Sequence, residues 1–139
     1  CFILALSTSV FSQDSINFEK DIEVTKQKAL KDGKKILLVF AGSDWCKPCM
    51  VFKKSILENQ KFIAFAKDSL HVLYLDFPSK RKNKLDSTQS AHNDSLAEEY
   101  NPEGTFPKVL LLNSTGTVLK SIETHNVSVQ SIVYACRLE

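Results

Sequence analysis

Two cysteines separated by two residues directly follow an unbroken apolar run, and this arrangement narrows the folds open to the chain. Residues 36–41 are all apolar, with β-branched and aromatic members, as expected of a strand buried on both faces. Three turn residues then lead to Trp45, Cys46 and Cys49. Pro48 suits the first turn of a helix, where its missing N–H has no intrahelical partner. The pattern predicts a strand that runs into a helix carrying a dithiol.

Two thiols one helical turn apart can close a small disulfide ring and reopen it, which is the minimum equipment for thiol–disulfide exchange. Cys46 is expected at the helix N-terminus, where free backbone amides favour negative charge, so it is predicted to be the attacking thiolate. Lys47 adds a nearby cation, and with Pro48 it is predicted to tune this thiolate. Cys49 is expected to be more buried and less acidic. The pair itself would be the redox group, so no other cofactor and no metal are expected.

The composition fits one domain. The chain has 139 residues, of which 43% are hydrophobic, so it is long enough for one core and too short for two. Its net charge of +2 is nearly balanced. The basic cluster of Lys80, Arg81, Lys82 and Lys84 is interpreted as a solvated loop, so no nucleic-acid partner is expected. We expect a monomer.

Residues 1–12 carry no charge, and their apolar run ends in small residues, as in the remainder of a secretory signal peptide. We therefore predict a signal remnant over 1–12 and a single domain over 13–139, exported to an oxidising compartment such as a periplasm. Two alternatives remain: residues 1–10 as a first strand, or a lipid anchor on Cys1, against which the adjacent apolar run argues. Removal of the signal remnant would also remove Cys1 and leave three cysteines. Cys136 then has no partner, and it is predicted to be an inert buried thiol.

The rest of the chain alternates helix and strand signals. Gly33 is a helix stop signal, and Asn59 can cap a second helical piece after the dithiol. Because helix joins the two apolar strands, they are predicted to be parallel. The remaining predicted elements are a helix over 19–31, a strand over 71–77, a charged loop over 79–93, a short helix over 94–100, a β-hairpin over 109–119 with its turn at 113–116, and a last helix over 128–138.

This element order resembles the thioredoxin-like superfamily. Its marks are the Cys-x-x-Cys after a buried strand and a second motif of Thr105, Phe106 and Pro107 just before the strand over 109–112. The likeness covers about residues 18–138 and is greatest to small exported proteins of Gram-negative bacteria. It implies an α/β fold with a central mixed β-sheet flanked by helices, and a charged loop inserted before the cis-proline region. It also implies a cis peptide bond between Phe106 and Pro107, with the proline facing the dithiol.

The resemblance implies a thiol–disulfide oxidoreductase that reduces or exchanges the disulfides of exported proteins. The form of the motif favours reduction over oxidation, and the dithiol would be recycled by an unidentified thiol or a membrane electron donor. Trp45, Phe106 and Pro107 would contact an extended segment of the substrate. Simple packing is the alternative reading for Trp45.

One position departs from the superfamily pattern. Many thioredoxins have a buried acid five residues before the tryptophan, and counting back from Trp45 gives Phe40. The usual proton acceptor for Cys49 is therefore predicted to be missing. Asp44 is a weaker candidate, acting through water.

Two other classes of function stay open. Cys46 and Cys49 could hold a soft metal ion, although His71, His92 and His125 lie outside any familiar ligand spacing. These histidines are interpreted as a strand end, a loop residue and a turn residue. A non-catalytic interaction domain is the other alternative, and the intact dithiol argues against it.

Overall fold

The computed structural model describes Ser9 and residues 12–138. The predicted signal remnant, the alternative first strand over 1–10 and the alternative lipid anchor on Cys1 rest on residues outside this part, so they stay predictions. The described elements are α1 (Ile22–Asp32), β1 (Lys35–Ala41), α2 (Lys47–Phe52), the π-helical η1 (Lys53–Leu57), α3 (Gln60–Ser69), β2 (Leu70–Asp76), the 3-10 turn η2 (Arg81–Asn83), α4 (Ser87–Tyr100), β3 (Lys108–Leu112), β4 (Val118–Ile122) and α5 (Val129–Arg137).

The strands form a mixed four-stranded sheet in the order β2-β1-β3-β4. β1 pairs in parallel with β2, as predicted from the helical connection, and antiparallel with β3, which continues into the predicted hairpin with β4. At the outer edge of β2, the amide of Glu19 donates to the carbonyl of Val72 at 2.8 Å, and the amide of Tyr74 donates back to Glu19 at 3.0 Å. The segment before α1 therefore covers part of this edge.

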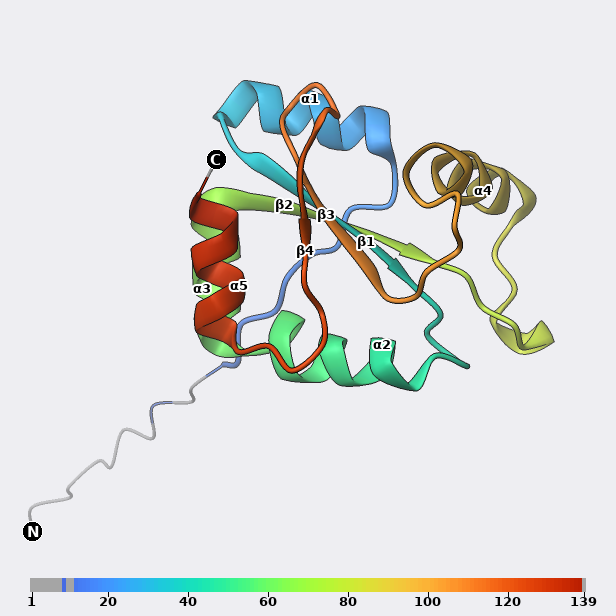
Figure 1. Ribbon diagram of the computed structural model, residues 1–139, viewed down its shortest axis with the longest axis horizontal. Coiled ribbons are helices and arrows are strands. Elements are labelled where there is room, and N and C mark those ends of the chain that lie inside the picture. The colour runs from blue at the N-terminus through green and yellow to red at the C-terminus, as the bar shows by residue number, and fades with distance from the viewer. Residues whose placement is uncertain (1–8, 10–11, 139) are drawn as a thin grey trace, which may run out of the picture.

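Helices cover both faces of the sheet (Figure 1), so β1 is buried on both sides. Its side chains alternate between two apolar clusters, because successive residues of a strand point to opposite faces. Val39 and Ala41 join the cluster built with α2, α3 and α5, which also contains Cys46 and Cys49. Phe40 joins the other cluster, built with α1 and α4. The dithiol thus belongs to one face of the sheet only.

The predicted helix ends are confirmed by their caps. Gly33 ends α1 in the left-handed region at φ 71°, which favours glycine. The Asn59 side chain accepts from the amide of Lys61 at 2.9 Å and starts α3. Ser128 and Ser131 form a reciprocal capping box at the start of α5.

The prediction of a loop over 79–93 is wrong in its second half. α4 begins at Ser87, with Asp86 as its N-cap. The first turns of this helix are polar and lack the apolar periodicity that marks a helix in a sequence. Tertiary hydrogen bonds hold it instead: Asn93 is buried, and its Nδ2 donates to the carbonyl of Asp76 at 3.0 Å. The charged loop is therefore shorter than predicted and contains the η2 turn.

The three histidines lie in different parts of the fold. His71 is in β2, and its Nε2 lies 2.7 Å from a carboxylate oxygen of Asp32. His92 was interpreted as a loop residue, which is wrong: it lies in α4, and its Nε2 accepts the amide of Ile22 at 3.1 Å. His125 lies in the turn between β4 and α5, as predicted. His71 and His92 thus have structural partners.

Candidate active site

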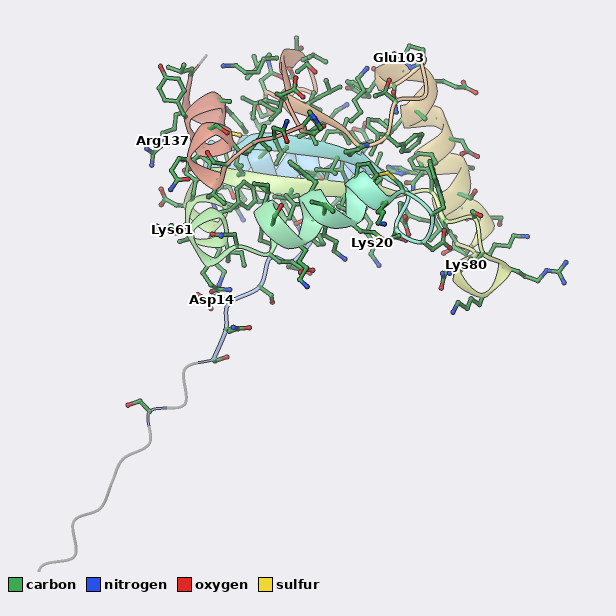
Figure 2. The ribbon with its side chains drawn as sticks, turned by 60° about the horizontal axis from the view of Figure 1, so that its bottom comes forward. Asp14, Lys20, Lys61, Lys80, Glu103 and Arg137 are labelled. Carbon is green, nitrogen blue, oxygen red and sulfur yellow. A yellow bond between two sulfur atoms is a disulfide. The ribbon has the colours of Figure 1, made fainter. Side chains whose placement is uncertain are left out.

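The dithiol lies where β1 turns into α2. Cys46 is the N-cap of α2 and Cys49 lies in its first turn, and the two form a disulfide with their Cα atoms 5.2 Å apart. Figure 2 shows it as a yellow bond at the start of this helix. The amide of Cys49 donates to Sγ of Cys46 at 3.3 Å. Both residues are largely buried, with Cys46 4% and Cys49 2% exposed. A helix amide is therefore already directed at the sulfur that was predicted to attack.

An aromatic wall stands beside the dithiol. Trp45 is 48% exposed, and its ring packs edge-on against Phe106 with centroids 5.3 Å apart. Phe106 packs in the same way on Phe77 at 5.4 Å, and the Trp45 indole donates to the Phe77 carbonyl at 2.7 Å. The peptide bond before Pro107 is cis, as the resemblance implied. Gly42 is required here, because a Cβ would lie 2.2 Å from the Trp45 ring.

A groove with a volume of about 490 Å³ runs along the other side of α2. Lys47, Pro48 and Val51 form one wall, and the turn before α5, including His125 and Val127, forms the other. Val51 is 61% exposed. Lys47 and Pro48, predicted to tune the thiolate, therefore also line an open surface next to it.

Asp44 is hydrogen-bonded to the charged loop and does not face Cys49. Its carboxylate accepts from the backbone amide of Ser79 at 2.8 Å, the backbone amide of Lys80 at 2.9 Å and Nδ2 of Asn83 at 2.9 Å. The amide of Ser79, then Asn83 and Lys80, lower the pKa of Asp44 from its ordinary 3.8 to about 2. A carboxylate with so low a pKa is a weak base, so these contacts do not support a role as proton acceptor. We call this contact set the Asp44 clamp.

A second carboxylate fixes the same turn from the other side. The amide and hydroxyl of Ser43 donate to the two carboxylate oxygens of Asp76, at 2.9 and 2.6 Å. Asp44 was predicted only as a weak candidate for proton transfer through water, and its contacts with the loop, like the role of Asp76, were not predicted from the sequence. A signal for Asp76 was available, because parallel pairing brings the end of β2 beside the active-site turn, and in the structure Ala41 lies opposite Asp76.

The sequence model of a family described as thioredoxin-like matches residues 17–114. The chain belongs to this thioredoxin-like family. A curated relative, the disulfide bond reductase DsbH of Chlamydia pneumoniae, is 34% identical over 103 residues, which are 74% of this chain and 58% of that protein. The thioredoxin-related protein DsbJ of the same species is 40% identical over 50 residues, 36% of this chain and 14% of that protein. The chain thus spans less than two thirds of the length of these two relatives.

Solved structures show the same thioredoxin-like fold. A DsbH oxidoreductase matches with a TM-score of 0.80 and 25% identity, covering 100% of this chain and 96% of that one. The C-terminal domain of DsbD from Neisseria meningitidis, in its oxidised form, matches with a TM-score of 0.56 and 18% identity, covering 86% of this chain and 96% of that one. The second likeness concerns the fold alone. The predicted α/β thioredoxin fold with a central mixed sheet is confirmed.

The position compared with the buried acid of many thioredoxins, five residues before Trp45, is Phe40. Phe40 belongs to the apolar cluster built with α1 and α4, and its ring packs on Phe77 with centroids 6.0 Å apart. Val39 and Ala41 share the cluster of Cys49. Successive residues of a strand point to opposite faces, so Phe40 and its two neighbours divide between the two clusters. All three residues are apolar, and the buried polar residues of the described chain are Thr25, Asn93 and Asn101, so no buried carboxylate lies beneath this thioredoxin-like dithiol.

The remaining cysteine of the described chain is Cys136, in the last turn of α5. It is free and buried, as predicted, and burial raises the pKa of its thiol to about 11. Within Ser9 and residues 12–138, no group of three or more His, Cys, Asp or Glu side chains is placed to hold a metal ion. No helix in this part of the chain has the length and apolar character needed to cross a membrane.

Proposed function

We propose that this protein is a thiol–disulfide oxidoreductase that reduces or exchanges the disulfides of exported proteins. The observation that carries the proposal is the Cys46–Cys49 disulfide, with the Cys49 amide donating to the Cys46 sulfur. Membership of the thioredoxin-like family supports it, as does the likeness to a disulfide bond reductase over 74% of this chain.

In the reductive direction the dithiol supplies two electrons. The thiolate of Cys46 attacks one sulfur of the substrate disulfide, forming a mixed disulfide and releasing the other substrate sulfur as a thiolate. Cys49 then attacks Sγ of Cys46, which closes the Cys46–Cys49 disulfide and releases the second substrate sulfur. The substrate gains two electrons and two protons and becomes a dithiol.

The proton of Cys49 needs an acceptor at the second step. No buried carboxylate lies among the described residues, and the Asp44 carboxylate is engaged by the clamp. The first substrate thiolate to leave is a stronger base than the Asp44 carboxylate, and it is formed beside the dithiol. We assign the proton to this thiolate, directly or through water, so that the substrate itself completes the step.

Two surfaces beside the dithiol suit an extended substrate segment. Trp45, Phe106 and Pro107 form the aromatic wall on one side, where an extended segment can lie against the ring faces. The groove past Pro48 and Val51 offers an apolar path on the other side. A disulfide carried by a peptide can reach Cys46 between them.

The setting of the reaction is part of the proposal. An exported, periplasmic protein acting as a monomer would meet disulfide-bonded substrates and need a thiol or a membrane electron donor for its own reduction. The uncharged residues 1–12 and the likeness to Dsb proteins support this setting.

The decisive experiment is the redox equilibrium of the 139-residue chain in glutathione buffers of defined ratio, followed by alkylation of free thiols and mass measurement. We expect one reversible two-electron transition, absent from Cys46→Ser and Cys49→Ser and kept in Cys136→Ser. Its midpoint places the protein among reductants or oxidants. No transition, or a Cys46→Ser variant that reduces a disulfide peptide at the wild-type rate, would refute the proposal.

A further inference from the structure

The loop between β2 and α4 concentrates positive charge beside the active site. We call residues 79–84 the basic loop, which holds four cationic side chains, all exposed: Lys80, Arg81, Lys82 and Lys84. Arg81, Lys82 and Lys84 make no ion pair with any residue of the described chain. Figure 2 shows the loop around the labelled Lys80 projecting from one corner of the molecule, with its long side chains extending into solvent. Lys80 lies in the field of the Asp44 carboxylate, and the other three cations have no ion-pair partner within the described chain.

The basic loop is held in place at the active site. The Asp44 clamp binds the amides of Ser79 and Lys80, and Asp44 is two residues before Cys46. The Trp45 indole binds the carbonyl of Phe77 just before the loop. Figure 1 shows the two segments side by side, at the ends of β1 and β2. A merely solvated loop needs no such attachment, whereas fixed charges bind a partner at a lower entropic cost.

A cavity of about 320 Å³ opens at the base of the basic loop. Arg81 and Lys84 line it, with Phe77 on the active-site side. Two carboxylates also line it: Asp76, which is bonded to Ser43, and Asp94, which is exposed on α4. The cavity therefore combines cations of the basic loop with the Phe77 ring and two carboxylates.

We propose that the basic loop docks an acidic segment of the substrate polypeptide next to the disulfide being reduced; this rests on the proposed function. Aspartate and glutamate side chains are the complementary groups, and the Arg81 guanidinium can bind a carboxylate in a bidentate manner. Clustered charge of one sign steers an oppositely charged partner and fixes its orientation. The basic loop thus selects among substrates, while the dithiol performs the same chemistry on all of them.

The test compares two disulfide peptides that differ only in their flanking residues, aspartates in one and asparagines in the other. Each is reduced by wild type, by Arg81→Gln/Lys84→Gln and by a control, Lys31→Gln/Lys61→Gln. The control removes the same charge from exposed lysines on α1 and α3, which make no ion pair within the described chain. All three proteins keep the dithiol, Asp44 and the backbone amides of the clamp.

We expect wild type and control to prefer the aspartate peptide by roughly tenfold in kcat/KM at low salt, and the loop variant to lose that preference. The asparagine peptide should be reduced equally by all three proteins. Equal rates for both peptides with wild type, or an equal loss in the control, would overturn the docking proposal.

A second readout does not depend on turnover. The same peptides with serines in place of their cysteines are titrated into the ¹⁵N-labelled protein, and backbone amide shifts are followed. We expect saturable shifts at residues 79–84 with the aspartate peptide only. If wild type reduces neither peptide, the proposed function fails, yet this titration still decides the docking proposal. Binding of phosphatidylglycerol vesicles without binding of the peptide would overturn it in favour of a membrane surface.

Discussion

The disulfide pair and Cys136 contribute to the same apolar cluster, and all three cysteines are buried, yet their surroundings differ. Cys46 caps a helix and receives the amide of Cys49. Cys136 lies in the last turn of α5, and burial raises its pKa to about 11. Burial alone therefore does not distinguish the two environments, whereas the Cys49 amide directed at Sγ of Cys46 does, because a backbone dipole in this orientation favours a thiolate.

The strongest test of this comparison removes the resolving thiol. Cys49→Ser should keep the attack by Cys46 but lose the second step, because no thiol remains to break the mixed disulfide. We expect turnover to fall at least about a hundredfold and the mixed disulfide to accumulate. Mass spectrometry of the acid-quenched reaction detects it. An adduct on Cys136 instead of Cys46 would reverse the assignment of the two thiol environments.

A carboxyl placed on each face of β1 tests which side belongs to the dithiol. Val39→Asp puts the acid into the cluster of Cys49, whereas Phe40→Asp puts it into the opposite cluster. Each should lower the free energy of unfolding by about 3 kcal/mol or more, since a buried acid is poorly solvated. Only Val39→Asp is expected to speed the Cys49 step in stopped-flow reduction. A faster step in Phe40→Asp alone would contradict the assignment of the faces.

A smaller effect is expected when the buried free cysteine, Cys136, is replaced. Cys136→Ser should lower the free energy of unfolding by about 1–2 kcal/mol, because it buries a hydroxyl in an apolar cluster, and should leave turnover within about twofold of wild type. In the wild-type protein, iodoacetamide at pH 8 should modify Cys136 only after denaturation. Rapid modification of the native protein would show that its thiolate is accessible.

The smallest effect concerns the Asp44 clamp. The pKa of Asp44 is lowered from 3.8 to about 2 in the folded protein, so the clamp contributes stability above about pH 4, and this contribution is lost as the pH falls through about 2. Amide shifts of Ser79 and Lys80 should follow this titration. Asp44→Asn should abolish this pH-dependent change in the amide shifts while leaving the disulfide intact. A midpoint near 3.8 in the wild-type protein would show that the clamp does not form in solution.

Much of the fold was predictable because its signals are local. The apolar run of β1 and the caps at Gly33, Asn59 and Ser128 each depend on a few neighbouring residues. The start of α4 was missed for the opposite reason. Its polar first turns are stabilised by Asn93 reaching the carbonyl of Asp76, a contact between residues 17 positions apart.

The candidate site likewise divides into features set by local motifs and features set by contacts between distant residues. The dithiol and the cis proline follow from motifs, but the surroundings of Cys49 depend on strand alternation, which puts Val39 on its face of the sheet rather than Phe40. The clamp joins Asp44 to Ser79 across 35 positions, and no spacing rule predicts such a contact. The parts of the site that depend on contacts between distant residues are thus the parts that need coordinates.

The Asp44 clamp binds mostly main chain. Two of its three hydrogen bonds come from the backbone amides of Ser79 and Lys80, and Asn83 supplies the third. Every residue except proline has such an amide, so the cationic side chains of the loop can be exchanged without loosening its attachment. The attachment of the basic loop therefore does not depend on its cationic side chains, and under the docking proposal the choice of substrate can change without altering the dithiol.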